Sequence, residues 1–168
     1  MALVKISKGA DIRHEYTDGV SRVPVLEGAY KDAAVERISL QPGAELSPAL
    51  YSKTEHNQVF LITAGKGYIV TPRRVFNITE VSVFVPDFDK EQFTFHCAAD
   101  AKECMEIVHF VTELNDYDKT CLKEAHLTLP RFRGVSQAWH YKEDFTGADI
   151  QQMMMIEHRN LGRLSMGA

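Results

Sequence analysis

The stretch Gln41–Gly67, QPGAELSPALYSKTEHNQVFLITAGKG, decides the fold of this chain. It opens with a Pro-Gly turn, continues through a polar run, and ends in the apolar segment Val59–Thr63 and the turn 64–67. Glycine tolerates positive φ, so Gly65 and Gly67 are expected corners between antiparallel strands. This pattern predicts that 67–71 (GYIVT) pairs back on Val59–Thr63.

The segments around this stretch are also short and strand-like, and turns separate them. Such spacing favours an all-β barrel or sandwich over βαβ units. We expect one barrel over residues 35–112, an N-terminal arm with edge strands over 1–34, and a C-terminal extension over 113–168 that packs on its own or a partner barrel. The remaining strands are expected at Val23–Leu26, Val35–Leu40, Val81–Val85, Glu91–His96 and Cys104–Val111.

Composition excludes several classes of protein. The chain has 168 residues, 45% of them apolar, which suffices for one buried core, and a net charge of −4. Its basic clusters, Arg73-Arg74 and 131–133, are interpreted as solvated loops, so no nucleic-acid partner is expected. No apolar run reaches the ~18 residues of a membrane span. Three cysteines without a CxxC pair favour a reducing compartment, and we expect a cytoplasmic protein.

The residues Pro42, Gly43, Gly65, Gly67 and Pro86 resemble the scaffold positions of the two cupin motifs, over about residues 35–111. This resemblance implies a jelly-roll barrel with its site inside the mouth. In that family, three histidines and a glutamate commonly hold a divalent iron, manganese, nickel or zinc ion.

The ligand positions of this chain depart from that motif. Gln58 stands where the family has its glutamate, and Glu91 stands where a histidine is expected. The paired histidines are replaced by Tyr51 and Lys53, or by Ser52 and Thr54, depending on the gap. We therefore predict no cofactor. Should a divalent metal bind, its ligands are expected to be His56, Gln58 and Glu91, because imidazole and carboxylate suit zinc or iron.

Three functions stay open at this point. The first is binding of a small polar molecule, a sugar or sugar acid, at the barrel mouth; the expected ligand-binding residues are Tyr51, His56, Gln58, Phe60, Glu91 and Phe93. The second is an isomerase or epimerase with His56 and Glu91 as catalytic acid and base. The third is a structural or regulatory dimer whose barrel is filled by Phe60, Phe93 and Phe95.

Purely structural roles compete with these assignments. His56 also suits a solvent-facing loop, and Gln58 and Glu91 could hydrogen-bond each other at the mouth. His109 lies between apolar neighbours in a strand and is interpreted as structural.

The tail, residues 161–168 (LGRLSMGA), resembles the opening strand of the second barrel in two-barrel sugar-acid isomerases. Unfinished strands must find a sheet, so we expect a homodimer formed through the C-terminal strands.

Overall fold

The computed structural model describes residues 12–26, 33–47, 56–86, 92–113 and 130–134, together with Asp116 and Thr120. Within these ranges every named element is a strand, which confirms the predicted all-β class. The strands are β1 (Val20–Leu26), β2 (Ala33–Leu40), β3 (Glu45–Leu46), β4 (His56–Ala64), β5 (Gly67–Val70), β6 (Val75–Ile78), β7 (Ser82–Val85), β8 (Thr94–Cys97), β9 (Met105–Glu113) and β10 (Arg131–Gly134). Among the described residues, no helix is long and apolar enough to cross a membrane.

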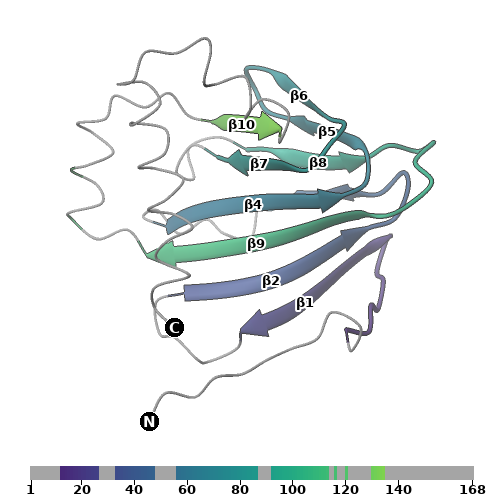
Figure 1. Cartoon of the computed structure of the whole chain (residues 1–168), viewed down its shortest axis with the longest axis horizontal. Coiled ribbons are helices and arrows are strands. Elements are labelled where there is room, and N and C mark those ends of the chain that lie inside the picture. Colours follow the sequence, from purple (N-terminus) through teal and green to yellow (C-terminus); the bar gives the residue numbers. More distant parts are fainter. Residues whose placement is uncertain are drawn as a thin grey trace.

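The strands form two antiparallel sheets. The larger has six strands in the order β1-β2-β9-β4-β7-β10, and the smaller has four in the order β3-β8-β5-β6. Figure 1 shows β1, β2, β9 and β4 side by side in this order, although β9 is far from both of its neighbours in the sequence. Strand β9 therefore lies at the centre of the larger sheet, between β2 and β4.

Alternation within the strands explains where the core lies. In β2, Ile38 and Leu40 are buried in the core, whereas Arg37 and Ser39 face the other side. Side chains on a strand point alternately to opposite faces, so one face of β2 is apolar. The core between the two sheets is built from residues of both: Ile38, Leu40, Leu46, Phe60, Ile62, Ile69, Ile78, Phe84, Phe93, Phe95, Cys97, Met105 and Ile107.

The expected hairpin of residues 67–71 on Val59–Thr63 is wrong. Strand β4 pairs with β7 and β9, whereas β5 pairs with β6 and β8 in the other sheet. The chain changes sheets at Gly65, which has φ +90°. A Cβ there would lie 2.5 Å from the Met105 Cα, so only glycine fits where the backbone passes so close to β9.

Two further observations concern the sheet edges. Strand β1 carries Pro24 and lies at an edge of the six-stranded sheet, as predicted from the intolerance of central strands for proline. The interpretation of residues 131–133 as a solvated loop is wrong: they belong to β10, which pairs with β7 at the opposite edge. The Phe132 ring lies 5.5 Å from the Phe76 ring, which explains why this basic segment is held in the sheet.

Candidate functional site

A row of polar side chains lies on the inner face of the six-stranded sheet, at one end of the apolar core. Glu36 and His109 are register partners on β2 and β9, so both point to this face. The His109 Nδ1 lies 2.8 Å from the Glu36 Oε1, and its Nε2 lies 3.1 Å from the Gln58 Oε1. The His109 side chain is fully buried and Gln58 is nearly so.

Arg22 on β1 extends the row to a fourth strand. Its Nε and Nη2 donate to the two carboxylate oxygens of Glu36 over 3.0 and 2.6 Å. Such a bidentate ion pair fixes the position of the carboxylate and also stabilises its ionised form. We call Arg22, Glu36, His109 and Gln58 the inner row; it crosses β1, β2, β9 and β4 in order.

Aromatic side chains pack around the inner row. The Phe60 ring stacks on the His109 ring, with centroids 4.0 Å apart and planes within 6° of parallel. Phe60 also contacts Phe93 and Phe95, with centroids 5.4 and 5.0 Å apart, and Phe84 completes the group. These four buried phenylalanines pack next to His109, so the hydrogen bond between His109 and Gln58 lies in a low-dielectric environment.

Burial and charge shift the pKa values of the central pair. Burial alone would raise the pKa of Glu36, but the hydrogen bonds from His109 and Arg22 outweigh it and lower that pKa to about 2. Burial lowers the pKa of His109, and the nearby Glu36 carboxylate offsets this only in part. The pair is therefore an ionised carboxylate beside a neutral imidazole at neutral pH.

Comparisons with known proteins agree with this architecture. No known family model matches the chain, and no curated protein matches its sequence. Many solved structures do match its fold, and three of them illustrate the likeness. A predicted oxalate decarboxylase from Thermotoga maritima aligns with TM-score 0.55 and 15% identity, over 66% of this chain and 100% of that one. KdgF from Halomonas sp. aligns with TM-score 0.54 and 10% identity, over 68% and 98%. A cupin 2 conserved barrel domain protein from Salinispora arenicola aligns with TM-score 0.52 and 6% identity, over 74% and 99%.

The chain folds as a cupin barrel. At these identities the likeness establishes the fold alone. The resemblance of residues 161–168 to a second barrel lies outside the described residues, and so does the expected C-terminal dimer contact.

The structure describes only part of the site predicted from the sequence. Gln58, Phe60 and Phe93 lie in the interior of the cupin barrel, with 4%, 0% and 8% of their surface exposed. His56 begins β4, where its backbone is the register partner of Glu113. Tyr51 and Glu91 lie outside the described residues. The expected contact between Gln58 and Glu91 therefore stays a prediction, whereas the contact between Gln58 and His109 is observed.

The described residues do not fit a metal centre of the kind that cupins commonly hold. Within the described ranges, no three histidine, cysteine, aspartate or glutamate side chains gather as a metal ion requires. Of the expected set, Gln58 contributes a neutral amide, and that amide contacts His109. The absence of a cofactor stays a prediction, because Glu91 and the side chain of His56 lie outside the described residues.

Sequence analysis missed the central members of this site, Arg22 and Glu36, and gave His109 only a structural role. One signal was available: Glu36 shares a strand face with Ile38 and Leu40, and a carboxylate on a buried face needs a partner. The partner could not be named, because the pairing of β2 with β9 joins segments far apart in the sequence.

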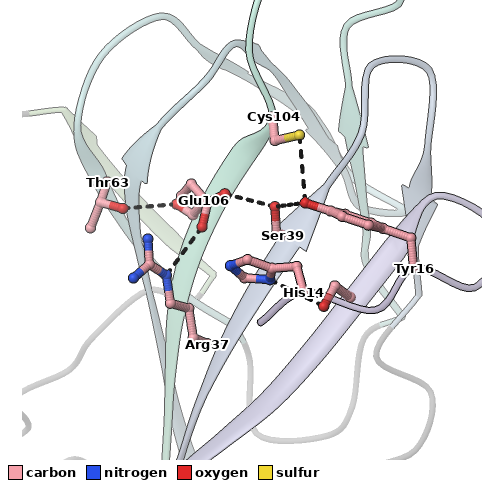
Figure 2. Close-up of polar contacts among 8 residues, drawn as sticks. His14, Tyr16, Arg37, Ser39, Thr63, Cys104 and Glu106 are labelled. Atoms are coloured by element: carbon pink, nitrogen blue, oxygen red, sulfur yellow. Dashed lines mark hydrogen bonds and ion pairs between the residues drawn. The ribbon is translucent and has the colours of Figure 1, made fainter. Parts of the chain in front are cut away.

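A second polar cluster lies on the opposite, outer face of the same sheet (Figure 2). The Ser39 hydroxyl donates to Glu106 Oε1 over 2.6 Å, and Arg37 Nε donates to Glu106 Oε2 over 3.2 Å. Tyr16, from the arm before β1, places its hydroxyl 3.0 Å from Ser39 Oγ and 3.8 Å from Cys104 Sγ. We call Tyr16, Arg37, Ser39, Cys104 and Glu106 the outer network.

The direction of the hydrogen bonds in the outer network follows from its carboxylate. Glu106 only accepts, so Ser39 donates to it and accepts from the Tyr16 hydroxyl; the Cys104 thiol then donates to Tyr16. The arm leaves Ser39 fully buried although it points outward, and His14 contacts the equally buried Ser21 at 3.1 Å. The network thus attaches the arm to the barrel.

Proposed function

We propose that this cupin barrel binds a small polar molecule, a sugar or sugar acid, at the end of its interior marked by the inner row. One observation carries the proposal: a hydrogen-bonded polar row, joined to the buried amide of Gln58, lies directly against an aromatic cluster. Sites for small polar ligands combine apolar and aromatic walls with a few placed polar groups.

The proposal assigns each part a role. Phe60 and Phe93 supply the apolar wall, against which the carbon face of a sugar ring packs. Gln58 supplies a hydrogen-bonding group that the inner row holds in place. Tyr51, His56 and Glu91 are proposed as further ligand contacts.

Saturation-transfer NMR with a panel of neutral sugars and sugar acids tests this function. The expected result is binding by the wild-type barrel and a loss of about tenfold or more in Gln58→Leu, because one hydrogen bond to the ligand is removed. His96→Ala is the matched control, since His96 stacks on Tyr68 on the outer side of the smaller sheet and leaves the inner row intact. Equal binding by Gln58→Leu and wild type, or no binding of any probe, would contradict the proposal.

The aromatic cluster favours a second candidate, a structural or regulatory barrel that acts as a homodimer. Phe60, Phe84, Phe93 and Phe95 are all buried and in mutual contact, as a filled interior requires. Light scattering of the full chain and of a chain shortened by about ten residues separates the two. A full chain that is dimeric and binds no sugar, with a monomeric or insoluble shortened chain, supports this second candidate.

A further inference from the structure

We propose that strand β6 is an association edge, at which the smaller sheets of two copies of this chain join in antiparallel order about a twofold axis. The axis passes beside Asn77, so that residue 77 of one copy lies opposite residue 77 of the other. This contact is separate from the dimer contact expected for the C-terminal strands, and it does not depend on a ligand.

In the described part of the chain the two sheets end in four edge strands, and three of these carry features that block further pairing. Strand β1 contains Pro24 and an irregular register between Pro24 and Leu26. Strand β3 has only two residues, and β10 carries Arg131 and Arg133. Proline, irregular pairing, shortness and charge are the means by which proteins keep a sheet edge from adding another strand.

Strand β6 has none of these features apart from its modest length. Its sequence, Val75–Ile78 (VFNI), contains no proline and no charge, and it pairs with β5 without an irregularity. Among the described residues, β5 is its only strand partner. Figure 1 shows β6 as the outermost strand at the top of the view, and Val75 on it is 57% exposed. This edge is therefore suited to take a further strand.

The alternation of side chains in β6 restricts how a second copy can pair with it. Phe76 and Ile78 face the core, whereas Val75 and Asn77 are exposed on the other face. Residues directly opposite each other in an antiparallel pair lie on the same face. A twofold axis perpendicular to the sheet keeps both core faces on one side. Such an axis places one residue near the middle of β6 opposite its own copy, either Phe76 or Asn77.

The charges at the two ends of β6 select Asn77. Arg74, which is exposed, directly precedes the strand, and Glu80 follows it. With Asn77 opposite its own copy, Arg74 of each chain lies opposite Glu80 of the other, so two pairs of opposite charge form. With Phe76 at the axis, Arg74 would instead lie opposite the apolar Ile78. Glu80 also lies close to Gly134 in its own chain, but a carboxylate accepts from several donors.

The same register suits the uncharged side chains of the strand. Phe76 of one copy lies opposite Ile78 of the other, which continues the apolar face across the axis. On the outer face the two Asn77 amides meet, and an amide both donates and accepts. A contact of four residues in each chain buries little surface, so the dimer is weak and forms as the concentration rises.

Sedimentation velocity of the full chain over a range of concentrations tests the contact. The wild type should shift from monomer to dimer as its concentration rises. Asn77→Lys should weaken the dimer by about tenfold or more, because two like charges then lie opposite each other at the axis. Thr17→Lys is the matched control, since it adds the same charge at an exposed position before β1. A wild type that stays monomeric, or a dimer that Asn77→Lys weakens no more than Thr17→Lys does, would overturn the proposal.

Disulfide cross-linking tests the register. Opposite residues of an antiparallel pair have Cα atoms about 4.5–5.5 Å apart, which is within reach of a disulfide. Asn77→Cys should therefore give a covalent dimer under mild oxidation, above the background of the native cysteines in the wild type. In Val75→Cys the two introduced thiols would be roughly 13 Å apart along the strands and should not cross-link. No added cross-link in Asn77→Cys, or equal cross-linking through residue 75, would overturn the register.

A chain shortened by about ten residues at its C-terminus separates this contact from the C-terminal one. The shortened chain should dimerise through β6 as the full chain does, and Asn77→Lys should weaken that dimer as well. A dimer that is lost on shortening but kept in full-length Asn77→Lys would belong to the C-terminal strands, and it would overturn the role of β6.

Discussion

The inner row and the outer network lie back to back on the same sheet, and each contains an arginine–glutamate pair. On the inner face Arg22 binds Glu36, and on the outer face Arg37 binds Glu106. The inner pair ends in a fully buried histidine against phenylalanine rings, whereas the outer pair ends in Tyr16, which is 37% exposed. The two ion pairs themselves are similarly exposed, so the two faces differ mainly in how deeply the residue at the end of each network is buried.

The largest difference is expected on removing the buried histidine. His109→Ala should lower the free energy of unfolding by about 3–5 kcal/mol, since it leaves a cavity and removes a partner from both Glu36 and Gln58. Urea unfolding followed by circular dichroism measures this. His96→Ala, which removes a ring contact near the surface, is the control and should cost less than about 1 kcal/mol. Equal costs for the two variants would show that the burial of His109 adds nothing measurable to stability.

The two faces should also differ in their response to pH, beginning with acid. The pKa of His109 is lowered in the folded state, so below 6.5 the unfolded chain takes up a proton first and stability falls as the pH decreases. Glu36 adds a second loss between 4.5 and about 2. The slope is at most about 1.4 kcal/mol per pH unit for each proton. Urea unfolding over this range measures it, and His109→Gln should remove the first step only.

At alkaline pH the outer network should respond instead. The Ser39 hydrogen bond lowers the pKa of Tyr16, but partial burial and the neighbouring Cys104 and Glu106 outweigh it and raise that pKa above 10.0. Stability from Tyr16 is therefore present below pH 10.0 and is lost as the pH rises above it. Absorbance of the phenolate during a pH titration of wild type and Tyr16→Phe follows this group. A phenolate that forms below pH 10.0 in the folded protein would be inconsistent with the network.

Ser39→Ala should have an intermediate effect, a loss of about 1–2 kcal/mol in urea unfolding, because Ser39 is fully buried and connects Tyr16 with Glu106. Ser39→Thr is the matched control, since it keeps the hydroxyl. If Ser39→Ala proved as stable as wild type, the hydrogen bonds of the outer network would contribute nothing measurable to the free energy of unfolding.

The smallest effect is expected for Tyr16→Phe, about 0.5–1 kcal/mol, since Tyr16 is 37% exposed. Its local effect should be larger than its global one. Hydrogen exchange should become faster in residues 12–17, which the network attaches to the sheet, and should stay unchanged in β9. Unchanged exchange in the arm would show that the hydroxyl does not hold it.

The parts of the fold that depend on residues close together in the sequence could be predicted, whereas those that depend on pairing between distant segments could not. Local alternation correctly predicted the strands of 35–40 and 81–85 and the edge position of Pro24, whereas an inward side chain of Phe95 was only one of the alternatives left open. It failed for residues 131–133, because their strand exists only through pairing with β7. It failed again at Gly65, where the signal for a turn was real but the change of sheet depends on Met105.

The candidate site shows the same limit more sharply. Gln58 was recognised from its place in a motif, and its burial agrees with an interior position. Its contact with His109 depends on the register between β4 and β9, and the contact of His109 with Glu36 depends on the register between β9 and β2. Neither register is encoded locally, so a polar residue on an apolar strand could be noticed but not given its partner.

The central place of β9 also determines when this protein can fold. Strands β1 and β2 are synthesised early, but the larger sheet has no centre until residues 105–113 have left the ribosome. Until then β2 and β4 lack the strand that pairs with both of them. The segment of chain that separates β2 from β9, and that must form a closed loop when they pair, is long. Chains with such distant contacts fold slowly and expose strand edges while they wait. The strand order, set by where β9 falls in the gene, thus delays the larger sheet until late in synthesis.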